Sequence, residues 1–96
     1  MARASYSGTT PSKVNSKLSA DQWLKAGKWV NVTSSNVAAI LYVWKWGTLY
    51  VRFKGGSEYR YAAVPKRTAK DFYHATSMGK FLAYRIKGNY SYTKIK

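Results

Sequence analysis

The stretch from residue 36 to residue 63 constrains the fold more than any other part of the chain. A mostly apolar run over residues 36–44 is followed by a Lys-Trp-Gly break and by residues 48–54, in which apolar and polar side chains alternate. A Gly-Gly break then precedes another alternating run over residues 58–63. Because short breaks of this kind join neighbouring antiparallel strands, the stretch predicts a β-meander.

Helical signals flank the meander. Ser19 and Gln22 have capping-box spacing before an apolar pair and Gly27, which predicts a helix over residues 20–26. Residues 28–33 alternate and are rich in β-branched side chains, so we expect a further strand there. After the meander, Pro65 stands where a helix best tolerates proline, which predicts a helix over residues 66–75. Its buried stripe would comprise Ala69, Phe72 and Tyr73.

A second helix is expected to follow, capped by Ser77 and stopped before Gly88. Its buried face would comprise Met78, Phe81, Leu82 and Ile86. Residues 89–96 read as a final strand or an extended tail. The predicted fold is α+β: a small antiparallel β-meander of three to five strands packed against two or three short helices.

The glycine break of the meander leaves two hairpin registers to consider. With a loop of the two glycines alone, Tyr59 and Tyr61 would share the open face of the sheet with Tyr50. With a three-residue loop that includes Lys54, both tyrosines would instead lie on the core face. The second register buries more apolar area, so we expect Tyr59 and Tyr61 to be structural.

Residues 1–17 differ in composition from the rest of the chain. Ser, Thr, Gly and Lys dominate them, and apolar periodicity is almost absent. We therefore expect a flexible basic tail over residues 1–17 and one domain over residues 18–96. A chain of 96 residues is long enough for one such domain and too short for two.

The charge balance points to a polyanionic partner. Seventeen lysines and arginines face three acids, which gives a net charge of +14. A compact domain with so much charge of one sign repels itself, and binding a polyanion is the usual compensation. The sequence shows neither a lipidation motif nor an apolar run near ~18 residues. We therefore expect nucleic acid as the partner and no membrane association.

Catalytic and cofactor chemistry find little support. The chain has no cysteine, so disulfides and thiolate metal sites are excluded, and the cytoplasm is the expected location. His74 is the one histidine, and with three acids it offers too few ligands for a metal site. No phosphate-binding loop, dinucleotide fingerprint or zinc-finger spacing occurs. We expect no enzyme and no cofactor; a metal-free ribonuclease using His74 with Glu58 is a remote alternative.

Several motifs resemble a known family. Tyr59-Arg60-Tyr61 is followed by Val64-Pro65, then by Ser77 and Gly79-Lys80-Phe81. In this order and spacing, residues 34–96 resemble the KTSC-domain family. That family is named after the carboxy-terminus of some lysyl-tRNA synthetases and includes small stand-alone proteins of bacteria and phages. The resemblance implies an α+β module, proposed to bind RNA or other nucleic acid, without catalytic residues or a cofactor.

Three segments combine the cations that pair with phosphates and the flat side chains on which bases stack. They are the polar face of the meander, the Lys-Trp-Gly turn, and the basic, tyrosine-rich segment from residue 80 onward. The candidate nucleic-acid-binding residues are Trp46, Tyr50, Arg52, Lys54, Arg60, Lys80, Tyr84, Arg85, Lys87, Tyr90, Tyr92 and Lys94.

The predicted function is binding of RNA or single-stranded DNA, in preference to duplex DNA, with low sequence specificity. Abundant aromatics suit unpaired bases, and no base-reading helix is recognisable. The alternative is a protein-interaction module, in a phage or bacterial setting, that docks on an acidic host or assembly protein. Clustering of Trp23, Trp29 and Trp46 outside the core would favour that alternative, because tryptophans are common at interface hot spots.

Overall fold

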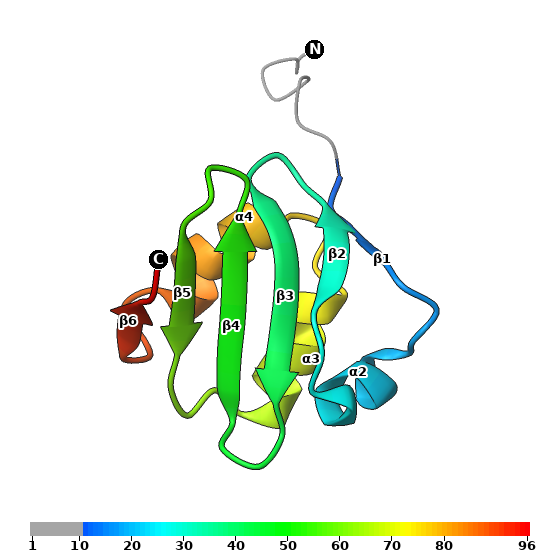
Figure 1. The fold of residues 1–96 in the computed structure, drawn as a ribbon, viewed down its shortest axis with the longest axis horizontal. Helices are drawn as coiled ribbons and strands as arrows, with labels where there is room; N and C mark the ends of the chain where they lie inside the picture. The colour runs from blue at the N-terminus through cyan, green and yellow to red at the C-terminus, as the bar shows by residue number, and fades with distance from the viewer. Residues whose placement is uncertain (1–10) are drawn as a thin grey trace.

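The computed structural model of the chain describes residues 11–96, which form one antiparallel sheet backed by short helices. The sheet has six strands in the order β1-β2-β3-β4-β5-β6, so every strand pairs with its neighbours in sequence. The helices all lie on one side of the sheet, and no element of residues 11–96 covers its other face (Figure 1). The elements are β1 (Lys13–Asn15), α2 (Ala20–Ala26), β2 (Val30–Thr33), β3 (Val37–Val43), β4 (Thr48–Phe53), β5 (Glu58–Tyr61), α3 (Lys66–Tyr73), α4 (Met78–Phe81), the π-helix η1 (Leu82–Ile86) and β6 (Tyr92–Lys94).

The predicted α+β class is confirmed, and the strand count exceeds the expected three to five because of the edge strand β1. The expectation of a flexible tail up to residue 17 is wrong for β1. Val14 of β1 pairs with Val32 of β2, and the Ser12 N–H donates to the Thr76 carbonyl at 2.7 Å. Composition missed this strand because its main support is backbone hydrogen bonding, which leaves little trace in side-chain pattern. The remainder of the expected tail, residues 1–10, lies outside the described residues.

The first helix follows its sequence signals closely. Ser19 Oγ accepts from the Gln22 N–H at 3.1 Å, and Gln22 Oε1 accepts from the Ser19 N–H at 2.9 Å. This reciprocal capping box starts α2 at the predicted residue. Gly27 adopts a φ of 63° and ends it, because a left-handed residue after the last turn costs glycine little. α2 carries Trp23 and Leu24 into the core.

The two later helices also form, with differences in detail. α3 buries the predicted stripe of Ala69, Phe72 and Tyr73, although Pro65 is its N-cap rather than its first helical residue. Ser77 caps α4 by accepting from the Lys80 N–H at 3.4 Å. The helix then continues as the π-helical turn η1 up to Ile86, and Gly88 beyond it has a φ of 84°.

The core lies between the sheet and the helices. Trp23 is fully buried, with its ring centroid 6.0 Å from that of Tyr42 and 5.1 Å from that of Tyr73. Ile40 from β3 and Leu49 from β4 are fully buried as well. Each such side chain contributes roughly 1.5–3 kcal/mol relative to full exposure, which is how a chain without disulfides holds together.

The hairpin between β4 and β5 has the predicted register. The Phe53 N–H donates to the Ser57 carbonyl at 2.8 Å, which leaves residues 54–56 as a three-residue loop. Leu49 therefore pairs with Tyr61, and Val51 pairs with Tyr59. Tyr61 is 2% exposed on the core face, as the second register requires.

Candidate nucleic-acid interface

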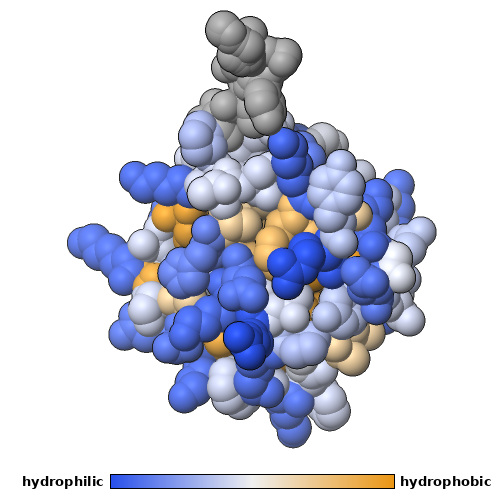
Figure 2. Space-filling view, turned by 180° about the vertical axis from the view of Figure 1, so that it is seen from behind, coloured by the Kyte–Doolittle hydropathy of each residue, from blue (hydrophilic) through white to orange (hydrophobic). Residues whose placement is uncertain are grey.

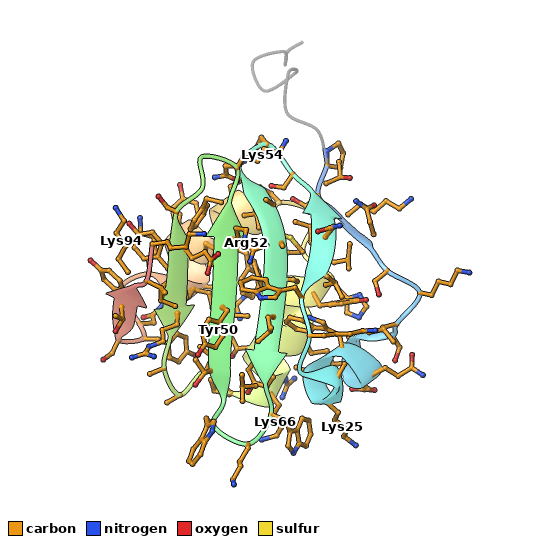
Figure 3. The ribbon with its side chains drawn as sticks, in the orientation of Figure 1. Lys25, Tyr50, Arg52, Lys54, Lys66 and Lys94 are labelled. Carbon is orange, nitrogen blue, oxygen red and sulfur yellow. The ribbon has the colours of Figure 1, made fainter. Side chains whose placement is uncertain are left out.

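The uncovered face of the sheet carries part of the predicted binding surface. Strand alternation turns Leu49 and Val51 towards the helices and leaves Tyr50 and Arg52 on the open side (Figure 3). The strand pairing sets Arg60 of β5 directly beside Tyr50. Three of the predicted residues, Tyr50, Arg52 and Arg60, thus form one strip across β4 and β5.

Trp29 extends this strip from the other side of β3. It lies between α2 and β2, and its ring packs edge-on against Tyr50 with centroids 6.2 Å apart. The Arg52 guanidinium lies 4.2 Å from the Trp29 ring centroid, which is a cation–π contact. Sequence reasoning had assigned Trp29 only to a hypothetical protein interface. It missed this contact because the two partners meet only once the strand order is known.

An ion pair fixes Arg52 in this position. Arg52 Nε lies 2.8 Å from Glu58 Oε2, and the Glu58 side chain is only 11% exposed. Lys96 Nζ approaches the same carboxylate at 3.9 Å. Arg60, in contrast, is exposed and forms no ion pair with any of residues 11–96. Arg52 therefore holds Trp29 in place, and Arg60 is the cation of the strip that is available to a ligand.

A shallow groove of about 400 Å³ runs over this face. Its lining combines apolar and aromatic side chains with one carboxylate, contributed by Gly27, Trp29, Leu41, Val43, Tyr50, Glu58 and Ile95. Flat and aliphatic surfaces beside exposed cations are what unpaired bases and their phosphates need.

The β3–β4 loop presents two tryptophans with different surroundings. Trp46 is 68% exposed, and Lys45 Nζ lies 5.2 Å from its ring. Trp44 is contacted by two cations, Lys66 at 4.3 Å and Lys25 at 5.1 Å from its ring centroid. Figure 3 shows Lys25 and Lys66 converging at this end of the sheet, although α2 and α3 supply them. The loop is thus a second basic and aromatic feature, separate from the strip.

The third predicted segment does not form a single patch. Lys80, Tyr84 and Arg85 lie on the helix-bearing side, where hydrophilic side chains surround smaller hydrophobic areas (Figure 2). Lys87 and Tyr92 line a cleft at the β5–β6 edge. Lys94 belongs to β6 at the same edge, and Tyr90 is half-buried against the core. Lys54, predicted as part of the polar face of the meander, stands in the β4–β5 loop.

Two tyrosines have perturbed acidity. Burial raises the pKa of Tyr42, whose hydroxyl donates to the Val64 carbonyl at 2.6 Å. Burial also raises the pKa of Tyr61, and the nearby phenols of Tyr59 and Tyr92 raise it further. Both side chains are therefore neutral hydrogen-bond donors at physiological pH.

The groups that a ribonuclease or a metal site would need are not brought together in the described part of the chain. His74 ends α3 and is exposed, whereas Glu58 faces the open side of the sheet and binds Arg52. No group of three or more histidines, aspartates or glutamates in residues 11–96 could hold a metal ion. Within the same range, no helix is both long enough and apolar enough to cross a bilayer.

These features define a small α+β protein whose sheet leaves one aromatic and basic face open. The family model of the KTSC domain matches residues 33–90, and the chain belongs to the KTSC domain family. A similar crystal structure, that of a KTSC domain protein from Yersinia pestis, has a TM-score of 0.67 and 33% sequence identity. The match covers 72% of this chain and 97% of that one. None of the curated proteins is similar enough in sequence to count as a relative.

The matched region divides the candidate residues. Tyr50, Arg52 and Arg60 of the strip lie inside residues 33–90. Trp29, which completes the strip, precedes the matched region, and Tyr92 follows it. The segments that flank the family match therefore supply Trp29 to the groove on the open face and Tyr92 to the cleft at the β5–β6 edge.

Proposed function

We propose that the protein binds single-stranded nucleic acid, RNA or single-stranded DNA, across the open face of its sheet and with low sequence specificity. The observation that carries this proposal is that Trp29 and Tyr50 of the strip place two aromatic rings beside Arg60, an exposed cation without an ion pair among residues 11–96. The remainder of the chain surrounds this strip with a large excess of positive charge.

The strip suits unpaired bases for a geometric reason. Stacking on Tyr50 or Trp29 requires access to the flat side of a base, which a duplex keeps covered by its neighbours. Each stacked base contributes roughly 1–3 kcal/mol, and every base has such a flat side, so stacking discriminates little between sequences. Arg60 beside Tyr50 would pair with the adjoining phosphate.

The net charge of +14 supplies the long-range part of binding. It concentrates a polyanion near the surface and accelerates its association, whatever the sequence of the polymer. Exposed lysines next to the strip, Lys28 and Lys96, would add phosphate contacts. The proposal places the protein in the cytoplasm, where a cysteine-free basic domain meets single-stranded nucleic acid.

Fluorescence anisotropy across a salt series tests the proposal. Labelled single-stranded RNA, single-stranded DNA and duplex DNA of equal length would be titrated with the full-length protein. With about five phosphate contacts, affinity for single strands should fall roughly a hundredfold between ~50 and ~200 mM salt. If no polymer binds more tightly than a size-matched inert polyanion, the nucleic-acid proposal is wrong.

Matched substitutions locate the surface. Tyr50→Ala should weaken single-strand binding about 5- to 150-fold, because it removes a stacking ring. Arg60→Gln should reduce the salt slope by about 0.7, because it removes one phosphate contact. Tyr84→Ala and Arg67→Gln make the same changes at exposed positions on the helix-bearing side and should alter neither quantity. If Tyr84→Ala has the larger effect, the strand binds on the helix side instead.

Docking on an acidic protein receives less support. The clustering that would favour it does not occur: Trp23 is buried in the core, Trp29 lies on the open sheet face, and Trp46 stands on the β3–β4 loop. A single tryptophan-rich interface patch is therefore not formed by these three residues.

A further inference from the structure

A second hollow lies at the β5–β6 edge of the sheet, on the side that faces the helices. It is a cleft of about 320 Å³, near the lower end of the roughly 300–1,000 Å³ range of small-molecule pockets. Its lining is mostly aromatic and comprises Phe53, Ser57, Tyr59, Tyr61, Lys87 and Tyr92. The strip on the open face contributes nothing to it.

The aromatic walls are held in fixed positions. Phe53 meets Tyr59 edge-on with ring centroids 5.7 Å apart. Tyr92 forms the outer wall, 5.7 Å from the Tyr59 ring and 6.2 Å from the Tyr61 ring. Although Tyr92 is 61% exposed, backbone bonds hold its strand against β5: Ala62 N–H donates to the Ser91 carbonyl at 2.8 Å, and Ile95 N–H to the Glu58 carbonyl at 2.7 Å.

One tyrosine in the wall of the cleft keeps its hydroxyl available to a ligand. Tyr61 is 2% exposed, yet its hydroxyl has no hydrogen-bond partner among residues 11–96. The other two deeply buried tyrosines behave differently, since Tyr42 donates to the Val64 carbonyl and Tyr73 to the Leu18 carbonyl. The one buried side-chain polar atom without a partner in residues 11–96 is Trp23 Nε1, so solvent reaches the Tyr61 hydroxyl. The Tyr61 hydroxyl is therefore a hydrogen-bond donor that a ligand in the cleft can use.

The charge of the cleft selects an anionic ligand. Lys87 is the one charged residue in the lining, and it forms no ion pair with any of residues 11–96. Lys94 pairs with Tyr59 across β5 and β6, so its side chain leaves the sheet on the same side as that of Tyr59. None of the three acids of the chain lines the cleft; Glu58 faces the opposite side and is bound to Arg52.

We propose that this cleft binds a single nucleotide, with its base against the rings of Tyr59 and Tyr92 and its phosphate at Lys87 and Lys94. The Tyr61 hydroxyl donates to an acceptor on the edge of the base. The shared chemistry is a flat heteroaromatic ring joined to a phosphate, and it can come from a free nucleotide or from one unstacked nucleotide of a strand. Because the cleft lies on the other side of the sheet from the strip, this proposal does not rest on strand binding by the open face.

Isothermal titration calorimetry with the full-length protein tests this site. The probes are AMP, UMP, adenosine and inorganic phosphate. We expect at least one nucleotide to bind, and adenosine and phosphate each to bind about tenfold or more weakly than AMP, because each lacks one of the two recognised groups. Equal affinity for phosphate and AMP would show a simple anion site and overturn the proposal, as would failure of both nucleotides to bind at millimolar concentration.

Variants assign the binding to the cleft. Tyr92→Ala and Lys87→Gln should each weaken AMP binding about fivefold or more. Tyr61→Phe keeps the ring and removes the hydroxyl, so it should weaken nucleotide binding while leaving the fold intact. The matched controls are Tyr84→Ala on η1 and Lys13→Gln on β1 at the far edge of the sheet, and both should bind AMP normally. Unchanged AMP affinity in both Tyr92→Ala and Lys87→Gln, with normal circular dichroism, refutes the site.

Titrations with a single-stranded oligonucleotide distinguish a free nucleotide from a nucleotide of a strand. They also distinguish binding in the cleft from binding on the open face. If Tyr92→Ala weakens the binding of AMP and also that of a single-stranded oligonucleotide, the cleft binds a nucleotide of a strand. If it weakens AMP alone, the ligand is a free nucleotide. Tyr50→Ala should retain AMP binding in both cases, so loss of strand binding by the open face and loss of nucleotide binding by the cleft are measured independently. Loss of AMP binding in Tyr50→Ala would move the nucleotide to the open face and overturn the cleft proposal.

Discussion

Tyr42 shows how one side chain ties the sheet to the helices. It is fully buried, and its hydroxyl donates to the Val64 carbonyl at 2.6 Å. The Val64 N–H donates to the Gly47 carbonyl at 2.8 Å, so both backbone groups of Val64 are paired just before α3 begins. Gly47 has a φ of 68°, a conformation that glycine adopts at little cost. The β3–β4 turn and the start of α3 are therefore held by the same few atoms.

Replacing Tyr42 by phenylalanine should show how much its hydrogen bond to Val64 stabilises the fold. Tyr42→Phe keeps the ring but leaves the Val64 carbonyl buried without its partner, which should reduce the free energy of unfolding by about 1–3 kcal/mol. Urea denaturation at neutral pH measures the change. Tyr84→Phe is the matched control, because Tyr84 is 76% exposed and its substitution should leave stability unchanged.

The native protein and Tyr42→Phe together also test the direction of the Tyr42 pKa shift. A phenol whose pKa lies above its ordinary value of 10.0 in the folded state holds its proton more tightly there than in the unfolded chain. Its stabilising contribution is complete below pH 10.0 and is lost as the pH rises through the folded pKa. Unfolding free energy should therefore fall more steeply above about pH 10 in the native protein than in Tyr42→Phe. Identical alkaline slopes would contradict the raised pKa.

At the scale of elements, α2 has two tasks. It brings Trp23 and Leu24 into the core, and its end at Gly27 turns the chain so that Trp29 reaches the open face of the sheet. Helices of this length are not stable alone and depend on capping and tertiary packing. The capping box at Ser19 thus supports both the core and the strip.

Ser19→Ala should destabilise the protein by about 1 kcal/mol, because the Gln22 N–H loses its acceptor and the first turn of α2 frays. Thermal or urea unfolding would report the change, with Ser35→Ala at an exposed loop position as the control. An equal loss in both variants would mean that the cap contributes nothing specific.

At the scale of the whole molecule, the net charge of +14 opposes folding. The ion pairs among residues 11–96 join Arg52 and Lys96 to Glu58 and Lys70 to Asp21, and they offset only a small part of this repulsion. Pairs of this kind contribute about 0–1 kcal/mol each where they are exposed. Self-repulsion between the remaining cations is therefore the larger electrostatic effect.

Stability should consequently rise with salt. Between about 20 and about 500 mM NaCl the screening length shortens severalfold, so repulsion weakens more than the few ion pairs do. The free energy of unfolding, measured with urea at both salt concentrations, should increase. A variant with Lys13→Gln and Lys17→Gln carries less repulsion and should show a smaller increase. A decrease with salt would mean that the ion pairs dominate.

The sequence determined several features that depend on local chemistry. The capping box fixed the bounds of α2, strand alternation sorted Leu49 and Val51 from Tyr50 and Arg52, and the three-residue loop followed from burial of Tyr61. The family motifs lie in the same region and were likewise recognisable from the sequence. These signals are readable because each involves residues that are close together in the chain.

Only the tertiary structure decided which side chains share a surface. The twelve predicted binding residues divide between the open face, two loops, the helix side and the β5–β6 edge, because helices and strands of one segment point in different directions. Trp29 meets Arg52 across β3, and Tyr92 closes the cleft over Tyr61, through contacts set by strand order rather than by neighbouring residues. The edge strand β1 likewise depends on backbone pairing with a distant partner, which side-chain pattern does not encode.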